Sequence, residues 1–265
     1  MVQLRSLAHA VALIAIAAAA AVPLARHKSD PSHNGFNSNT NADPALKAAL
    51  TGATSYNDRQ AILFTNPPDA SNITFSYINN TVTDGTGGTI ALSTVNNFPA
   101  LIGTEVAMAI GFVNPCGLNV PHSHPRANEI LTVIQGKLIG GLILELNNGN
   151  TGHIVGQPAP AKGPIPQVTA TLSNYTGMLF PQGETHFQFN PTCEPALFAA
   201  AFDSSDPGRT QIARNFFSNM PDEVLLASSG DLEVLDAKRI AEFRNNIPTA
   251  FAVIMEECAV SALHY

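Results

Sequence analysis

The sequence predicts an all-β sandwich or barrel, and three observations support this fold class. From about Ala61 onward, short β-type runs are separated by turn residues. Loops such as Gly156 to Pro166 contain residues that prevent a strand from continuing. Of the 265 residues, 45% are hydrophobic, which is ample for a core. Strands are expected at Ile73 to Tyr77, Thr89 to Leu92, Val106 to Val113, Glu129 to Ile134, Leu138 to Glu145, Gln167 to Leu172, Gly177 to Phe180, Thr185 to Phe189 and Ala196 to Phe202.

Residues 1–25 are predicted to be a secretory signal peptide. Arg5 precedes an apolar run from about Ala10 to Val22, and small residues suited to cleavage lie at its end. The alternative is a membrane anchor, but the run is shorter than the roughly 20 residues that a transmembrane helix needs. We therefore expect a secreted, extracellular protein.

Residues 26–60 are predicted to contain a mobile arm and a short helix. Arg26 to Asp43 is rich in Ser, Asn, His and Pro and has no hydrophobic period. Pro44 to Leu50 follows Asp43, a good N-cap residue, and has proline at the first helical position. The β domain is then expected over residues 61–217.

Residues 218–265 are predicted to form a helical extension. Helix-forming residues occur at Pro221 to Leu226 and at Asp236 to Asn245, and Pro248 ends the second segment. The apolar face of this tail is expected to pack either on the same barrel or on a neighbouring subunit.

The charge composition argues against two classes of partner. The chain has a net charge of −7, only 12% of its residues are charged, and its Lys and Arg residues are scattered. Nucleic acids and anionic membrane surfaces attract clustered positive charge. We therefore expect no nucleic-acid partner and no membrane partner after signal cleavage.

Secretion gives meaning to three Asn-x-Thr triplets and to the cysteines. Asn72, Asn79 and Asn174 are candidate acceptors of N-linked glycans. Three cysteines in an oxidising compartment leave one that is either unpaired or joined to another chain. Cys116 lies six residues before His122, and Cys193 lies seven residues after His186. If the strands that carry these two histidines are neighbours, the two cysteines come close together. We therefore expect a disulfide between them, with Cys258 left over. The alternative is three buried thiols.

Three histidines and one glutamate form a candidate metal site. His122 and His124 are two residues apart, so both side chains point to one face of a strand. Glu129 would point the opposite way on a regular strand, but Pro125 interrupts the strand before it. His186, on a later predicted strand, completes the set. Three imidazoles and a carboxylate suit Mn, Fe, Ni, Co or Zn, and a six-coordinate metal would keep two positions open for water or a small anion.

The spacing of these residues resembles the germins, germin-like proteins and spherulins, which are members of the cupin superfamily. The germin box one pattern is G-x5-H-x-H-x3-4-E-x6-G, and the stretch from His122 to Gly136 fits it fully. Cys116 stands where the pattern has its first glycine, next to Gly117.

Box two of the family is G-x5-P-x-G-x2-H-x3-N, and Pro181 to Asn190 fits it. Tyr175 occupies the position of its first glycine, and we expect the nearby Gly177 to relieve the same turn. The resemblance spans roughly Ala61 to Phe217, with two independent motifs in the right order.

This resemblance implies a single cupin jelly-roll barrel with the metal inside, near one mouth. It also implies that His122, His124, Glu129 and His186 bind manganese and that the chain forms a homo-oligomer. The activities that it implies are superoxide dismutation, or oxalate oxidation in which dioxygen is reduced to hydrogen peroxide.

The oxalate-oxidising germins have two asparagines near the metal, and only one has a counterpart here. Asn119 matches the first, three residues before the first histidine, whereas Ala109 stands where the second is expected. Asn119 is equally explained as a turn residue beside a proline. Gln188 and Asn190 share the strand face of the box two histidine and are candidates for orienting a ligand or water, although Asn190 equally fits the end of the strand.

Two functions follow as hypotheses. The first is a secreted manganese oxidoreductase that acts on superoxide or on a small carboxylate, and the alanine argues against oxalate as the substrate. The second is a non-catalytic, metal-binding extracellular protein associated with the wall or with encystment, as the spherulin resemblance suggests.

Overall fold

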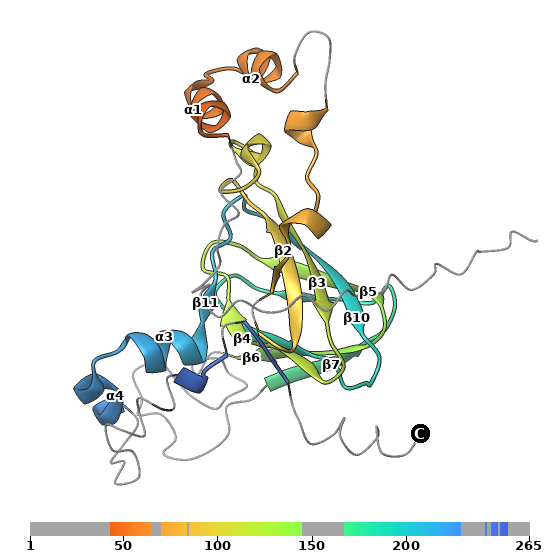
Figure 1. The fold of residues 1–265 in the computed structure, drawn as a ribbon, viewed down its shortest axis with the longest axis vertical. Coiled ribbons are helices and arrows are strands. Elements are labelled where there is room, and N and C mark those ends of the chain that lie inside the picture. The colour runs from red at the N-terminus through yellow and green to blue at the C-terminus, as the bar shows by residue number, and fades with distance from the viewer. Residues whose placement is uncertain are drawn as a thin grey trace, which may run out of the picture. The chain divides into compact units, whose positions relative to one another are not determined.

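Two antiparallel β-sheets form a jelly-roll barrel, so the predicted all-β class is confirmed (Figure 1). The computed structural model describes residues 43–64, 70–83, 85–144, 167–228, 242, 245–248 and 250–253. The first sheet has the order β1 (Val82–Thr83), β2 (Gly88–Ser93), β3 (Ala107–Val113), β10 (Ala196–Phe202), β5 (Glu129–Gln135) and β8 (Gly177–Phe180). The second has the order β11 (Thr210–Gln211), β4 (Gly117–Ser123), β9 (Thr185–Phe189), β6 (Leu138–Ile143) and β7 (Gln167–Leu172), and β12 (Phe251–Val253) also pairs with β4.

The core lies between the two sheets and follows from the two-residue alternation of the strands. In β10, buried residues alternate with more exposed ones along most of the strand, as expected when one face of a sheet is covered. Phe180 and Phe198 are at most 1% exposed, and Leu131 and Leu138 are fully buried. Burial of each such side chain contributes about 1.5–3 kcal/mol, so this core is the main source of stability.

Helices precede the barrel, and one of them was not predicted. The helix expected after Asp43 is confirmed as α1 (Pro44–Gly52), with Asp43 Oδ1 accepting a hydrogen bond from Ala45 N at 2.9 Å. Helix α2 (Tyr56–Leu63) follows, capped by Ser55, whose Oγ accepts a hydrogen bond from Asp58 N at 3.1 Å. Helix α2 buries no residue and so has no apolar stripe that would mark it in the sequence.

The predicted strand from Ile73 to Tyr77 is wrong. Ile73 ends the short 3-10 helix η1 (Ser71–Ile73), and residues 74–77 connect it to a second one, η2 (Ile78–Asn80), without forming a strand. Thr74 Oγ1 donates to Ala70 O at 2.8 Å and Asn80 Nδ2 donates to Ser76 O at 2.8 Å. Such local side-chain bonds compete with strand pairing, and they outweigh the β propensity of the aromatic residues. A third 3-10 helix, η3 (Pro99–Leu101), precedes β3.

The C-terminal part contains both the predicted helical segment and an unexpected strand. Helix α4 (Asp222–Ser228) confirms the helix expected at Pro221 to Leu226. Helix α3 (Ile212–Asn219) was not predicted and begins inside the residues assigned to the β domain. Most of the second predicted helix lies outside the described residues. Strand β12 then pairs with residues 117–119 of β4. Among the described residues, no helix is long and apolar enough to cross a membrane. The predicted signal peptide and arm, residues 1–42, lie outside the described part.

Four motif positions adopt the left-handed backbone conformation that favours glycine. Gly136 and Gly183 have φ of 88° and 83°. Cys116 and Tyr175, which replace the first glycines of the two motifs, have φ of 54° and 64° and are the positive-φ residues other than glycine in the described chain. The expectation that Gly177 relieves the second turn is wrong, because Tyr175 itself makes the turn. The motif glycines thus mark a backbone requirement, which this chain meets twice at the cost of strain.

Relief of this strain should stabilise the protein. Tyr175 is 81% exposed and its backbone N–H donates to Val133 O at 2.7 Å, so Tyr175→Gly keeps the turn and loses little packing. We expect the free energy of unfolding to rise by about 0.5–1 kcal/mol, since the relief exceeds the extra entropy that glycine gives the unfolded chain. Urea denaturation measures this change. Tyr175→Ala, which keeps a Cβ, is the control, and a glycine variant less stable than the alanine variant would contradict the account.

The predicted disulfide between Cys116 and Cys193 is wrong. Cys116 is disulfide-bonded and almost fully buried, whereas Cys193 is exposed and retains its thiol. The two strand ends are neighbours as expected, because Cys116 N donates to Thr192 O at 3.2 Å. Their side chains differ in burial, however, and proximity of the backbone does not make the sulfurs face each other. Cys258 lies outside the described residues.

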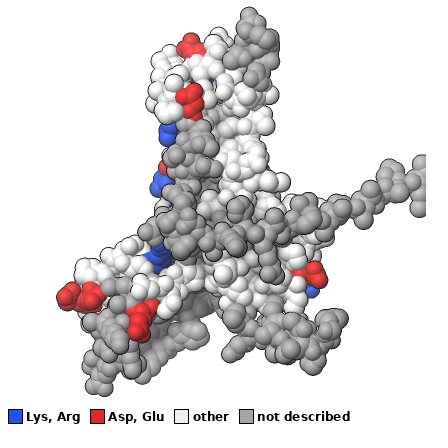
Figure 2. Space-filling model, in the orientation of Figure 1, with Lys and Arg blue, Asp and Glu red and all other residues white. Residues whose placement is uncertain are grey.

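The three candidate glycosylation sites differ in exposure. Asn79 and Asn174 are exposed, whereas Asn72 is half-buried and its Nδ2 lies 3.4 Å from Leu63 O. A glycan on Asn72 would have to break that contact, so Asn79 and Asn174 are the better acceptors. On the face drawn in Figure 2, the described charged side chains are scattered over a largely uncharged surface.

Candidate metal centre

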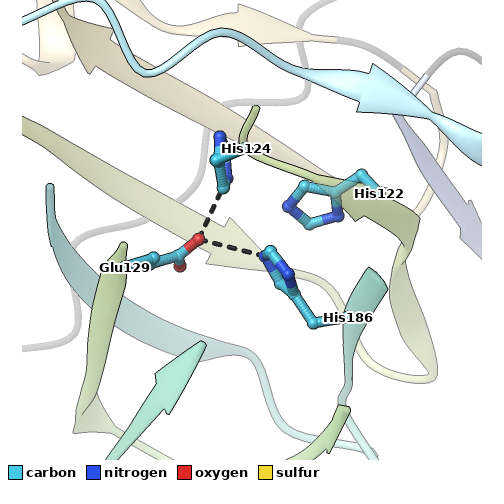
Figure 3. A group of neighbouring side chains, drawn as sticks. All are labelled: His122, His124, Glu129 and His186. Atoms are coloured by element: carbon cyan, nitrogen blue, oxygen red, sulfur yellow. Dashed lines mark hydrogen bonds and ion pairs between the residues drawn. The ribbon is translucent and has the colours of Figure 1, made fainter. Parts of the chain in front are cut away.

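The four predicted metal ligands meet between the two sheets (Figure 3). His122 lies near the end of β4 and His124 follows directly after that strand, while His186 lies in β9. His122 and His186 are cross-strand partners, with ring centroids 4.3 Å apart. Glu129 begins β5 in the other sheet, so the site joins both sheets.

The break predicted at Pro125 is confirmed as the loop that moves the chain from one sheet to the other. β4 ends at Ser123 and β5 begins at Glu129, so five residues separate them. Gln182 Nε2 donates to Pro125 O at 2.8 Å, and Gly183 N donates to His124 O at 2.9 Å. The box two turn therefore braces the loop that carries a histidine of box one.

The ligand atoms of the four residues are close enough to bind one ion. They all lie within 4.8 Å of one another. Glu129 Oε2 lies 3.0 Å from His124 Nε2 and 3.1 Å from His186 Nε2. All four residues are buried, with exposed fractions of 4% or less. A buried cluster of this kind is unfavourable unless its polar atoms have a common partner.

The second nitrogen of each imidazole explains why the cluster fits a cation. Each Nδ1 lies within hydrogen-bond distance of a backbone carbonyl oxygen, at 2.8 Å from Val120 O for His122, 2.6 Å from Gly208 O for His124 and 2.9 Å from Glu184 O for His186. A carbonyl oxygen can only accept, so these contacts place a proton on Nδ1 and leave the Nε2 lone pair for a metal. With neutral imidazoles, the Nε2 atoms and the carboxylate are then all acceptors, and a divalent cation satisfies them together.

The ionisation of the site also favours metal binding. Burial alone raises the pKa of Glu129, but its contacts with the imidazoles of His124 and His186 lower it to about 2. Burial lowers the pKa of His122 well below its usual value, and the positive charge of Arg209 lowers it further. At neutral pH, Glu129 is therefore ionised and His122 is neutral, which are the forms that bind metals.

A pocket opens beside the ligands. Its empty volume is about 310 Å³, which includes space open to solvent. Side chains of several apolar residues form most of the wall, and Asn119 and Arg209 supply polar groups beside three of the metal ligands. The lining residues are Ile90, Leu92, Ala109, Asn119, His122, His124, Glu129, Phe198, Ala200, Phe202 and Arg209.

Three further residues were expected near the metal, and two of them, Asn119 and Gln188, lie next to the site. Asn119 lines the pocket, and its Nδ2 donates to Gln188 Oε1 at 2.6 Å. Gln188 is fully buried, and its Nε2 has no hydrogen-bond partner among the described residues. Asn190 instead donates to Glu194 O at 2.7 Å and accepts from Thr192 N at 3.0 Å. These bonds stabilise the turn after β9. Asn190 therefore ends the strand, which was the alternative to a role in orienting a ligand.

The segment between β10 and β11 also contributes to the site, although no residue in it was predicted to do so. Gly208 O accepts the hydrogen bond from His124, and Arg209 donates from a guanidinium nitrogen to Asn119 Oδ1 at 2.8 Å. No motif marks this segment. It reaches the site because Thr210 and Gln211 of β11 pair with Ser123 and His122 of β4, a pairing of two residues that is too short to recognise in the sequence.

The fold and the site together define a jelly-roll protein with a buried cluster of three histidines and one glutamate that could hold a metal ion. A model of the cupin family matches residues 76–230, more than half of the chain. The chain therefore belongs to the cupin family.

Curated relatives agree with the motifs. The chain is 36% identical over 219 residues to Spherulin-1A of Physarum polycephalum, covering 82% of this chain and 78% of that protein. It is 37% identical over 142 residues to Germin-like protein 4-1 of Oryza sativa subsp. japonica, covering 52% of this chain and 51% of that protein. The resemblance to germin-like proteins and spherulins is thus confirmed.

Solved structures agree on the fold. An oxalate oxidase structure aligns with a TM-score of 0.54 at 24% identity, covering 66% of this chain and 80% of that one. An oxalate decarboxylase from Bacillus subtilis aligns with a TM-score of 0.51 at 16% identity, covering 68% of this chain and 41% of that one. At these identities the comparison concerns the fold alone.

Proposed function

We propose that this chain is a secreted, manganese-dependent oxidoreductase that acts on a small anion, either superoxide or a small carboxylate. The observation that supports this proposal is the pocket beside the four ligands. A structural metal site is closed by protein, whereas a catalytic site keeps positions open toward substrate. Here protein supplies four ligands, and the remaining side of the cluster faces a pocket that contains Arg209.

The protein residues have separable tasks in this proposal. His122, His124, Glu129 and His186 would hold the metal, which supplies electron transfer when it is bound. The backbone carbonyls at Val120, Gly208 and Glu184 fix the imidazoles. The apolar wall, which includes Phe198 and Phe202, limits the entry of water. Manganese is proposed on the donor set and on the likeness to germin-like proteins, although this donor set accepts other divalent metals.

A non-catalytic role is the second candidate. Ala109 lines the pocket with a methyl group at the position where an amide was expected for oxalate oxidation. The chain is 36% identical to Spherulin-1A, and the spherulin resemblance suggested a non-catalytic, metal-binding extracellular protein of the wall or of encystment. The two candidates differ in one measurable property, which is turnover.

The experiment uses the chain expressed through a secretory pathway and purified with its bound metal. Metal content is quantified, and then superoxide loss and oxalate-dependent release of hydrogen peroxide are measured. The proposal expects about one manganese per chain and at least one of the two activities. Full metal loading with neither activity would establish the non-catalytic role instead.

Homo-oligomer formation is also part of this proposal. Exposed apolar side chains form a row across four neighbouring strands of the first sheet, because Met108, Ala201, Ile130 and Leu179 are successive cross-strand partners. Ile130 and Leu179 are 54% and 57% exposed. A continuous apolar row on the outer face of a sheet is typical of a protein interface.

A charge placed in this row should weaken the assembly. We expect Ile130→Lys to lower the mass measured by light scattering toward that of the monomer, since it buries an unpaired charge in the interface. Val168→Lys is the control, because Val168 is 47% exposed but lies on β7 in the other sheet. A monomeric unmodified protein, or equal masses for all three proteins, would contradict this interface.

A further inference from the structure

The residue that the proposed function leaves unexplained is Arg209. Its side chain lines the pocket with His122, His124 and Glu129, and it is only partly buried. It directly precedes β11, whose pairing with β4 places position 209 beside the end of the strand that carries the histidines.

The charge of the pocket points to an anion. A divalent cation on ligands of which only Glu129 is charged leaves a net positive centre, and the guanidinium of Arg209 adds a second positive charge. Guanidinium remains protonated at any physiological pH. Two positive centres beside one pocket repel each other, so an anion that lies between them is stabilised by both.

The hydrogen-bonding groups narrow the class of anion. Asn119 donates to Gln188 and accepts from Arg209, so its amide is oriented by the protein. Ala109 cannot donate. Apart from the imidazoles and the amide of Asn119, the guanidinium is the side-chain donor group among the residues that line the pocket, and it is the charged one. Its planar fork matches a carboxylate, which it can bind through two parallel hydrogen bonds.

We propose that Arg209 is a substrate-positioning residue that binds the carboxylate group of a small organic anion beside the metal. This inference rests on the proposed function, because it names the substrate class of the same site. It favours the carboxylate substrate over superoxide, for which a distant charge would only speed the encounter. Arg209, held by Asn119, would supply the anion contact that an amide at position 109 cannot provide.

The test measures binding and needs no turnover. The holoprotein is loaded with Mn²⁺, and the relaxation of water protons by the bound ion is followed during titration with oxalate, which displaces metal-bound water. We expect Arg209→Gln to weaken oxalate binding by about ten- to a hundredfold, the usual effect of losing a hydrogen bond to a charged group. Arg209→Lys, which keeps the charge and loses the fork, should be intermediate.

Two controls separate positioning from folding. Arg59→Gln removes the same charge from α2, where the guanidinium contacts Ala100 O outside the pocket, and should leave oxalate affinity unchanged. Metal content and proton relaxation without oxalate should be equal in Arg209→Gln and the unmodified protein, because the metal ligands remain. If Arg209→Gln loses its metal, the oxalate affinity of Arg209→Lys is compared with that of the unmodified protein instead.

The outcomes distinguish this inference from the proposed function. Equal oxalate affinity of the metal-loaded Arg209 variants and the unmodified protein would overturn the inference, as would a metal-loaded unmodified protein that binds no oxalate. If oxalate binding depends on Arg209 but no turnover is detected, the inference is supported and the proposed oxidoreductase activity is rejected.

Discussion

Replacement of Glu129 by glutamine should abolish metal binding. Glu129 is the only negatively charged ligand, it is 3% exposed, and its Oε2 lies within 3.1 Å of two imidazole nitrogens. Glutamine has nearly the same shape but has no charge to offset a divalent cation. Loss of a residue that merely orients a ligand costs about 10- to 100-fold in metal affinity, so loss of this ligand should cost more than about a hundredfold. Any activity should fall with the metal content.

The same measurement has a matched control. Glu105→Gln makes the identical chemical change at an exposed carboxylate outside the cluster and should keep full metal content. Circular dichroism of both variants checks that the barrel is folded, and metal content after dialysis gives the comparison. If Glu129→Gln retains as much metal as the control, the metal does not bind at these four residues.

Phe180→Ala should strongly destabilise the core. Phe180 is fully buried, and its ring stacks on His186 with centroids 4.4 Å apart and planes 13° apart. Truncation leaves a cavity between the sheets and removes the surface that holds the imidazole. We expect a loss of about 3–5 kcal/mol in the free energy of unfolding of the metal-free protein, measured by denaturation in urea. Metal affinity should also fall, since His186 loses its support.

Tyr56→Ala is the control for this second prediction. Tyr56 is 72% exposed, so its truncation should change the free energy of unfolding by no more than about 0.5 kcal/mol. Metal-free protein is required for both variants because bound metal would add its own stabilisation. Similar losses for Phe180→Ala and Tyr56→Ala would show that the core does not lie between the sheets as described.

The ligands could be predicted from the sequence because strand geometry and the motifs are local. His122 and His124 lie two residues apart at the end of one strand, and Pro125 marks where the chain leaves it. The motif around His186 is equally continuous. Strands β7, β8, β9 and β10 have the predicted limits for the same reason, since their runs are bounded by turn residues.

The remainder depends on contacts that are distant in sequence. Arg209 reaches the pocket through β11, and β12 pairs with β4 across more than 130 residues of chain. Cys116 and Cys193 show the same limit, because neighbouring strand ends do not determine which side chains face each other. In the sequence, the backbone strain at Tyr175 appears only as a tyrosine in place of the glycine of the motif. Its φ of 64° shows that the position requires the left-handed conformation that glycine adopts more easily.

The most direct test of the central claim is a titration of metal-free protein with Mn²⁺, in which bound metal and the rate of superoxide loss or of oxalate-dependent peroxide release are measured at each point. We predict saturation at about one ion per chain and a rate that rises in proportion to occupancy. A rate that stays at the level of the metal-free protein while the four-ligand site fills would contradict the assignment of this site as a redox centre.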